Sequence, residues 1–507
     1  MGALARKLCD DPYTVARDDF ESIVDLLKSG DAASLTHHDL ESLLTGRGLE
    51  LMRELLQAHV KTRGPGEAAV PVRGADGVER HTARPHARGL TTVFGDIDVQ
   101  RLGYGAEGVD SLHPLDAELN LPDEQYSLGL RRKVAVEAAK GSFDEVVEAI
   151  STQTGAAVPK RQVEQLVQRA AVDFNAFYVQ RALPATSPGE ILVITVDGKG
   201  VVMLPSSLRE ETRKKAAGKR RKLQGRLSKG EKLNGKRMAT VAAVYTIAPF
   251  ERGPEDLVHV QAPLREAERV RPRPENKRVW ASLEQDAEEV IAQAFDEAAR
   301  RDPARKKTWV ALVDGNNHQL ALLRREARRR KVDLTIVVDI IHVSEYLWSA
   351  SLCFHTEADP QREAWVEDRL LRILHGTASQ VAAGMRRSAT KRGLEKREAV
   401  DDCADYLLKK KRYLRYDLHL ARGLPIATGV IEGACRHLVK DRMDLTGARW
   451  SLDGAEAVLR LRALRSSGDF DAYWEFHQAR EFERNHRKRY AENKVVPIRG
   501  RPLRRVK

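Results

Sequence analysis

Two aspartates in this 507-residue chain follow patterns typical of buried strands. Asp197 follows LVITV, Asp314 follows VALV, and each stands directly before a glycine. An ionised carboxylate at such a position costs several kcal/mol unless it is paired or bound to a metal. Open α/β sheets also bind ligands at the carboxyl ends of their strands. A turn-forming Asp-Gly would explain either aspartate alone, but two in matched contexts favour a metal site.

A third acid for such a site is Glu432, in the helical stretch GVIEGACRHLVKDRM. Helical spacing places Arg436, Val439 and Lys440 on its side, which would turn basic groups toward a phosphate. A solvated helix face is the alternative for this glutamate. Two Mg²⁺ ions roughly 3.5–4 Å apart stabilise the attacking and leaving oxygens of phosphoryl transfer, and they prefer carboxylate ligands. We therefore expect these three acids to bind two Mg²⁺ ions, for which Mn²⁺ can substitute.

Asp339 and His342 form an Asp-x-x-His pair in VVDIIHVSEYLW, where a strand pattern passes into a helical one. The pair fits a strand-end carboxylate with a histidine that caps the next helix. It equally fits two residues that support the metal ligands or contact DNA. Asp339 also competes with Asp314 for the role of second acid, and the buried strand, the glycine and the polar residues that follow favour Asp314.

The remaining composition excludes several classes of protein. The four cysteines (Cys9, Cys353, Cys403 and Cys435) contain no Cys-x-x-Cys pair, which argues against a disulfide scaffold or a zinc ribbon. A zinc enzyme built on Cys353, His355 and Cys435 lacks a compact four-ligand set. No run approaches 18 apolar residues and the first residues lack an apolar core, so we expect a cytoplasmic protein.

Positive charge is concentrated in two runs. The chain carries 86 Lys+Arg against 73 Asp+Glu, a formal net charge of +13. Residues 206–237 hold 13 Lys/Arg and three Glu, and residues 480–507 hold 11 Lys/Arg and three Glu. Two such runs beside ordered elements favour contact with a nucleic-acid backbone over simple solvated segments. The densest cluster is Lys219, Arg220, Arg221 and Lys222.

Apolar patterns predict an α/β fold, with a sheet covered by helices, in the middle of the chain. The expected strands are 190–204, 238–250, a short one at 256–261, 308–314 and 333–343. An amphipathic helix is expected at 280–301. Residues 1–63 are expected to be helical, residues 64–90 to form a linker or loop, and residues 91–105 to form part of a small sheet.

Residues 128–174 predict two helices joined by a turn that contains Gly155. Lys160, Arg161 and Gln162 fall in the first turn of the second helix. This arrangement is typical of a helix-turn-helix that reads DNA, and also of any helical hairpin. We expect these three residues to contact DNA.

The motifs VDGKG, LVDGNNHQL, the DIIH pair and GVIEGACRHLVKDRM occur in this order, followed by GARWSLDGAEAVLRLRAL. This ordered set resembles the ISKra family of bacterial insertion-sequence transposases, which belong with the Mutator-like DDE transposases. The resemblance covers roughly residues 90–470. It implies an RNase H-like domain whose acidic triad is Asp197, Asp314 and Glu432, with Asp339 and His342 as the C/D-x-x-H signature.

The same resemblance implies Mg²⁺-dependent cutting at transposon ends and strand transfer into target DNA. It also implies binding to double-stranded terminal inverted repeats, for which residues 128–174 are the candidate reader. Joining two ends predicts at least a homodimer on DNA, associated with the bacterial nucleoid. Further DNA contacts are expected from Arg436, Lys440, Arg442, Arg449 and Trp450.

Trp450 has two interpretations. Beside Arg449 it could stack on an unpaired base, an interaction worth about 1–3 kcal/mol. Alternatively it anchors the catalytic helix to the core.

Two other functions stay open. A metal-dependent DNA endonuclease without strand transfer would use the same triad. A transposase-derived DNA-binding regulator that is inactive is expected to have lost an acid, whereas all three are present here.

These predictions divide the chain into seven regions. They are an N-terminal helical region (1–63), a linker with a small β region (64–127), a helix-turn-helix-like DNA-binding region (128–186), the first part of an RNase H-like core (187–342, with a basic insertion at 206–237), an all-helical insertion (343–425), the Glu-bearing part of the core (426–470) and a basic C-terminal tail (471–507).

Overall fold

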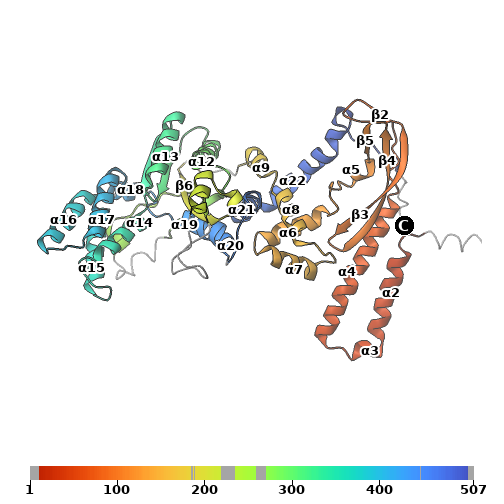
Figure 1. Cartoon of the computed structure of the whole chain (residues 1–507), viewed down its shortest axis with the longest axis horizontal. Coiled ribbons are helices and arrows are strands. Elements are labelled where there is room, and N and C mark those ends of the chain that lie inside the picture. The colour runs from red at the N-terminus through yellow and green to blue at the C-terminus, as the bar shows by residue number, and fades with distance from the viewer. Residues whose placement is uncertain are drawn as a thin grey trace, which may run out of the picture. The chain divides into compact units, whose positions relative to one another are not determined.

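The computed structural model describes residues 11–183, 187, 189–218, 235–258, 270–445 and 447–500 (Figure 1). The chain divides into two compact units. Unit 1 comprises Met1–Gln180 and Asp469–Lys507, and unit 2 comprises Arg181–Gly468. No helix in the described ranges is both long and apolar enough to cross a membrane.

Unit 2 is built on a five-stranded mixed sheet. Its strands are β6 (Ile191–Val202), β7 (Lys236–Ile247), β8 (Glu275–Ser282), β9 (Thr308–Val313) and β10 (Leu334–Val338). They lie in the order β10-β9-β6-β7-β8. Strands β6, β7 and β8 pair antiparallel, whereas β9 is parallel to β6 and β10 is parallel to β9. The predicted α/β class is therefore confirmed.

The third strand of this sheet is not where the sequence predicted it. Residues Glu255–Val258 form the short helix α11, and residues 259–261 lie outside the described part of the chain. The third strand is β8, whose charged residues conceal it: Arg278 is buried there and its guanidinium pairs with Glu297 at 2.7 Å. The predicted helix at 280–301 consequently begins later, at α12 (Ala287–Arg301), where Asp286 and Glu289 form a capping box.

Helices follow the strands in the order that the apolar pattern predicted. After β9 comes α13 (Asn317–Arg330), and after β10 come α14 (Ile340–Ser351), α15 (Gln361–Leu374), α16 (Ala378–Lys391), α17 (Glu398–Lys410) and α18 (Tyr416–Ala421). The helical insertion predicted at 343–425 is thus helical in the structure, and Figure 1 shows α15, α16 and α17 as a group. The chain then forms α19 (Gly429–Ala434), a π-helical turn (Cys435–Lys440), α20 (Asp441–Met443) and α21 (Leu452–Ser467).

Unit 1 joins helices to a small antiparallel sheet. Its helices are α2 (Thr14–Lys28), α3 (Gly30–Ala33), α4 (His37–Thr62), α5 (Pro114–Glu118), α6 (Leu128–Ala138), α7 (Phe143–Gln153), α8 (Lys160–Ala170), α9 (Phe174–Gln180) and α22 (Phe470–Asn485). Its sheet has the order β3 (Thr82–Thr92), β4 (Gly95–Ala106), β5 (Val109–Leu112), and β1 (Val72–Arg73) pairs with β2 (Glu79–Arg80). Helices α6, α7 and α8 pack against one another.

Two predictions for unit 1 need correction. Residues 82–90 are not a loop, because β3 pairs with β4 along its whole length. Pro85 is tolerated because β3 is an edge strand. The predicted basic tail begins instead with the helix α22, in which Arg484 pairs with Asp173 at 2.9 Å.

Candidate active site

Three aspartates lie in one row across adjacent parallel strands. The register pairs Thr195 of β6 with Leu312 of β9, and Leu312 with Val337 of β10. Two residues further along the chain come Asp197, which lies within β6, and Asp314 and Asp339, which directly follow β9 and β10. Residues two apart point to the same face of a sheet, and neighbouring strands lie about 4.8 Å apart. The structure therefore brings the two predicted aspartates together, with Asp339 as their neighbour.

Asp197 occupies a different place in its strand from the one predicted. It does not end β6, because β6 continues to Val202 and remains paired with β7. The pairing with β9 does end at Thr195, so Asp197 lies where the parallel ladder stops. One of its oxygens accepts a hydrogen bond from the backbone N–H of Gly198 at 2.6 Å, and the other from the Cys435 thiol at 3.2 Å.

Asp314 and Asp339 differ in how their oxygens are used. Asp339 is buried and caps α14: one oxygen accepts from the N–H of Ile341 at 2.9 Å, and the other accepts from the hydroxyl of Thr428. Asp314 is only half-buried, and its single side-chain hydrogen bond comes from the N–H of Asn316 at 2.8 Å. Asp314 therefore has more freedom to bind a metal, which favours it as the second acid.

Glu432 reaches the same site from α19, which packs on β6 and β7. Its pKa is raised above the ordinary value. Partial burial of its carboxyl group is the largest cause, followed by the charges of Asp339 and Glu345. Asp197 acts in the same direction with a smaller effect, whereas a hydrogen bond from Thr428 opposes it. Glu432 is thus close to carboxylates that repel its own charge.

The helix that carries Glu432 departs from the predicted spacing. Cys435–Lys440 forms a π-helical turn, which places an extra residue in the turn. Val439 is consequently buried while Glu432 is exposed, so these two residues do not share a side as predicted. Arg436 and Lys440 remain exposed, as a phosphate contact requires.

The four acids (Asp197, Asp314, Asp339 and Glu432) form no ion pair with any cationic side chain in the described ranges. Buried or crowded carboxylates normally obtain such a partner or bind a metal. Lys410 lines the same cavity as Asp314 without forming an ion pair with it. The acids therefore leave negative charge that hard divalent cations with oxygen ligands would balance.

His342 lies in the first turn of α14 and does not bond Asp339. Its Nδ1 lies 3.0 Å from a Glu345 oxygen. Its ring meets the edges of Tyr346 and Tyr406 at centroid distances of 5.3 and 5.7 Å. The Asp-x-x-His pair therefore consists of a buried helix cap and a histidine that packs on two tyrosines.

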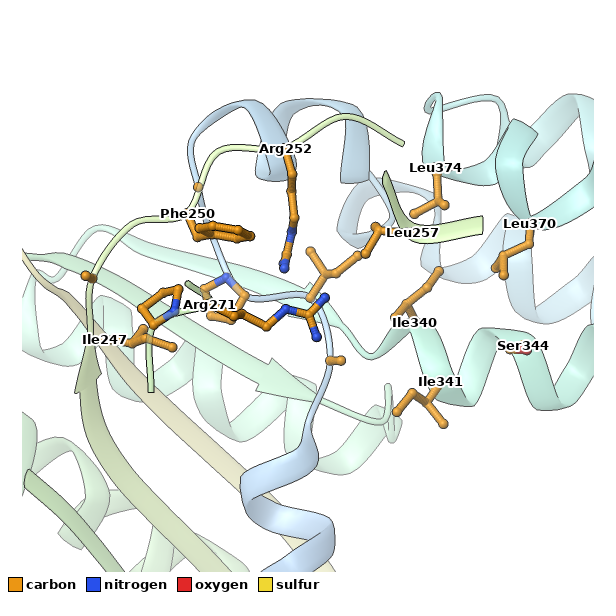
Figure 2. A pocket seen from close by; sticks show the side chains of 16 residues that line it. Ile247, Phe250, Arg252, Leu257, Arg271, Ile340, Ile341, Ser344, Leu370 and Leu374 are labelled. Carbon is orange, nitrogen blue, oxygen red and sulfur yellow. The ribbon is translucent and has the colours of Figure 1, made fainter. Parts of the chain in front are cut away.

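Two cavities of unit 2 are lined by residues at or next to the site. The first, of about 560 Å³, is polar and is lined by Asp314, His342, Tyr346, Tyr406 and Lys410 among others. The second, of about 360 Å³, is mainly apolar (Figure 2). Figure 2 shows Ile340 and Ile341 on one side of it and Phe250, Arg252 and Arg271 on another; its lining contains no carboxylate. Of the four acids, Asp314 lines the polar cavity and none lines the apolar one.

Of the predicted DNA-contacting residues that the structure describes, five are exposed and two need correction. Trp450 and Arg442 are buried, at 6% and 2% exposure, and the guanidinium lies 4.7 Å from the indole centroid. The indole N–H donates to the Met443 carbonyl at 3.2 Å. Trp450 therefore anchors this segment to the core, and neither side chain is accessible to DNA. Arg449 is exposed.

In unit 1, Lys160 and Arg161 are exposed and Gln162 is half-buried at the start of α8. The Lys160 ammonium pairs with Asp144 at 2.7 Å, and both side chains are exposed to solvent. The other predicted DNA contacts, Lys219, Arg220, Arg221 and Lys222, lie outside the described residues.

Sequence reasoning missed several residues at the site. Thr428 and Cys435 flank Glu432 and contact Asp339 and Asp197 respectively. Their positions four residues before and three residues after Glu432 on one helix could have indicated them. Tyr406, by contrast, is 92 residues from Asp314 in the sequence, and no local pattern indicated it.

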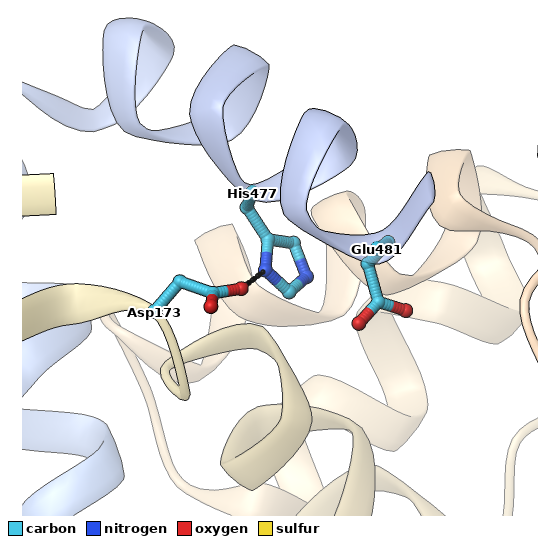
Figure 3. A group of neighbouring side chains, drawn as sticks. All are labelled: Asp173, His477 and Glu481. Atoms are coloured by element: carbon cyan, nitrogen blue, oxygen red, sulfur yellow. Dashed lines mark hydrogen bonds and ion pairs between the residues drawn. The ribbon is translucent and has the colours of Figure 1, made fainter. Parts of the chain in front are cut away.

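A second group with metal-ligand chemistry lies within unit 1 and was not predicted. Asp173, His477 and Glu481 are buried together (Figure 3). His477 Nδ1 lies 2.8 Å from an Asp173 oxygen. The guanidinium of Arg131 already occupies the other side, 3.0 Å from His477 Nε2 and 2.8 Å from Glu481. Because Arg131 is 1% exposed, a metal ion would have to displace a buried cation.

Arg484 completes this network through hydrogen bonds to Asp173 and Glu481. Burial alone would raise the pKa of Asp173, but the bonds from His477 and Arg484 lower it to about 2. The carboxylates are therefore balanced by arginines, and we interpret the group as an ionic tie between α22 and the rest of unit 1.

We expect that Zn²⁺ does not raise the melting temperature of the protein by binding at His477. Arg131 takes the coordination positions that Zn²⁺ would need. Thermal unfolding of the wild type and of His477→Gln, each with Zn²⁺ and with a chelator, checks this. A zinc-induced stabilisation of the wild type that is lost in His477→Gln would contradict it.

Comparison with known proteins adds no assignment. No protein-family model matches the chain, and no curated protein matches its sequence.

Proposed function

We propose that this chain is a metal-dependent DDE transposase that cuts DNA at the ends of an insertion sequence and joins them to target DNA. The observation that carries the proposal is the row of Asp197, Asp314 and Asp339, met by Glu432 from a helix, with no compensating ion pair in the described ranges. A protein that used these acids only for stability would be expected to pair them with cations.

The sheet supports the finer fold assignment within this proposal. Three antiparallel strands are followed by two parallel ones, and the first strand is central in the order. This is the arrangement expected of an RNase H-like core. The first acid lies on the first strand and the second acid after the fourth. The glutamate lies on a helix that follows the helical insertion.

The residues fit two Mg²⁺ ions. Asp197, Asp314 and Glu432 would hold them, since all three offer carboxylate oxygens of the kind that Mg²⁺ prefers. Bound Mg²⁺ would stabilise the charge that develops on the phosphate oxygens during displacement. Asp339 would orient the site through Thr428, and the exposed Arg436 and Lys440 would bind the DNA backbone.

DNA recognition is proposed for unit 1. In a helix-turn-helix the N-terminal residues of the second helix contact base edges, which assigns this role to Lys160, Arg161 and Gln162 of α8. Two element ends must meet for joining, so the active complex is proposed to contain at least two copies of the chain.

The test uses the two DNA segments that flank this chain's own coding sequence, as labelled duplexes with Mg²⁺. Sequence-specific nicks together with joined products are expected, and a shuffled duplex of the same composition is the control. Cut products without joined products would support a DNA endonuclease instead. Binding without cleavage, in Mg²⁺ or Mn²⁺, would support an inactive regulator.

A further inference from the structure

Helix α17 of the helical insertion contacts the loop that carries the second acid. Tyr406 and Lys410 are four residues apart and so lie on one face of this helix. The Tyr406 hydroxyl donates a hydrogen bond to the backbone carbonyl of Asp314 at 2.7 Å. The Lys410 ammonium donates to the side-chain carbonyl of Asn317. Two side chains of one helix thus hold both ends of the segment 314–317.

The glycine after Asp314 is explained by this contact. Gly315 has φ of +92°, and a Cβ added there would lie 2.8 Å from the Tyr406 hydroxyl oxygen. A larger residue would therefore be strained in its backbone and would push Tyr406 away from the carbonyl. The Asp-Gly pair permits the close approach of the tyrosine.

Tyr406 is itself held rigidly. Its ring stacks on Tyr346 with centroids 4.2 Å apart and an interplanar angle of 17°, and His342 meets both rings edge-on. Burial, together with the charge of Asp314, raises the pKa of Tyr406, so its hydroxyl keeps the proton that it donates. His342 thus packs against the tyrosine whose hydroxyl bonds the Asp314 carbonyl.

A second tyrosine repeats this contact at the neighbouring strand. Tyr416, at the start of α18, is fully buried, and its hydroxyl donates to the backbone carbonyl of Val338 at 2.7 Å. Val338 directly precedes Asp339. The ends of β9 and β10 are therefore each held by a tyrosine hydroxyl from the helical insertion.

We propose that the helical insertion positions the metal-binding acids, with Tyr406 and Tyr416 as positioning residues that fix the ends of β9 and β10 through their hydroxyls. This inference rests on the proposed function, because it assigns the acids to a metal. A functional constellation must be held within about 0.5 Å of its productive geometry by supporting groups. The paired register of β9 and β10 ends at Val313 and Val338. The Asp339 N–H still donates to the Val313 carbonyl at 2.9 Å, and the tyrosine hydroxyls add bonds to the carbonyls of Asp314 and Val338.

The test measures Mn²⁺ binding by electron paramagnetic resonance on the full chain without DNA. Tyr406→Phe keeps the stacked ring and removes only the hydroxyl. We expect it to weaken the Mn²⁺ sites that depend on Asp197 by about three- to tenfold, the effect of one lost hydrogen bond. The double variant Tyr406→Phe/Tyr416→Phe should weaken them further.

The matched control is Tyr413→Phe, next to the end of α17. Tyr413 is buried, but its hydroxyl has no hydrogen-bond partner among the residues that the structure describes. This variant should bind Mn²⁺ like the wild type. Melting temperatures of all variants are measured in parallel, so that a loss of folding is separated from a loss of metal affinity.

The outcomes separate the two proposals. Wild-type affinity in a folded Tyr406→Phe would overturn the positioning role and leave the metal site intact. Wild-type Mn²⁺ binding that is unchanged in Asp197→Ala would overturn the metal site itself, and the positioning role with it. Equal weakening in Tyr406→Phe and Tyr413→Phe would show a general packing effect and would also overturn the positioning role.

Discussion

Glu432→Gln is expected to reduce metal-dependent DNA cleavage by about 10³-fold or more without destabilising the protein. The amide cannot balance a divalent cation, so the reaction loses a ligand on which the other acids depend. The pKa of Glu432 is raised mainly by partial burial of its carboxyl group and by the charge of Asp339, so its charged form costs stability at neutral pH. That cost is absent at low pH and grows as the pH rises above the ordinary value of 4.5 for a glutamate.

The measurement combines cleavage of the labelled duplex with thermal unfolding in the absence of metal. Asp197→Asn and Asp314→Asn should lose cleavage in the same way. The control is Asp333→Asn, an exposed acid at the opposite end of β10, which should keep wild-type cleavage. Cleavage that survives in Asp314→Asn and is lost in Asp339→Asn would move the second acid to Asp339.

Glu297→Gln is expected to lower the free energy of unfolding by about 3–5 kcal/mol, because it leaves buried arginines without their counter-charge. The Glu297 side chain is completely buried and pairs with Arg278 and Arg301 at 2.7 Å and with Arg181 at 2.9 Å. These contacts tie α12 to β8 and to the segment that precedes β6. Denaturant unfolding followed by circular dichroism measures the change.

The matched control for this variant lies on the same helix. Glu288 of α12 pairs with Arg325 in an exposed geometry, so Glu288→Gln should cost less than about 1 kcal/mol. An equal effect of the two variants would contradict the role of the buried network.

The pH dependence of stability follows from the same residue. Burial would raise the pKa of Glu297, but the three arginines lower it to about 2. Its contribution should therefore be complete above the ordinary pKa of 4.5 and be lost as the pH falls toward 2.

Much of unit 2 was predictable because its signals are local. The apolar runs before Asp197 and Asp314 become β6 and β9, and the helical pattern after Thr428 becomes α19. The failures come from interactions between separate elements. Strand β8 was missed because the charge of its buried Arg278 is balanced by Glu297, 19 positions away. Strand β3 was missed because it has no run of apolar residues and is held by its pairing with β4.

The sequence by itself determined which apolar runs form the strands beside Asp197 and Asp314, because hydrophobic periodicity is a property of neighbouring residues. Tertiary structure alone decided which acids share a site. The register across β6, β9 and β10 adds Asp339 to the row, and a π-helical turn separates Val439 from the side of Glu432. The contact of Tyr406 with Asp314 spans 92 residues, so only the packing of the helical insertion could bring the two together.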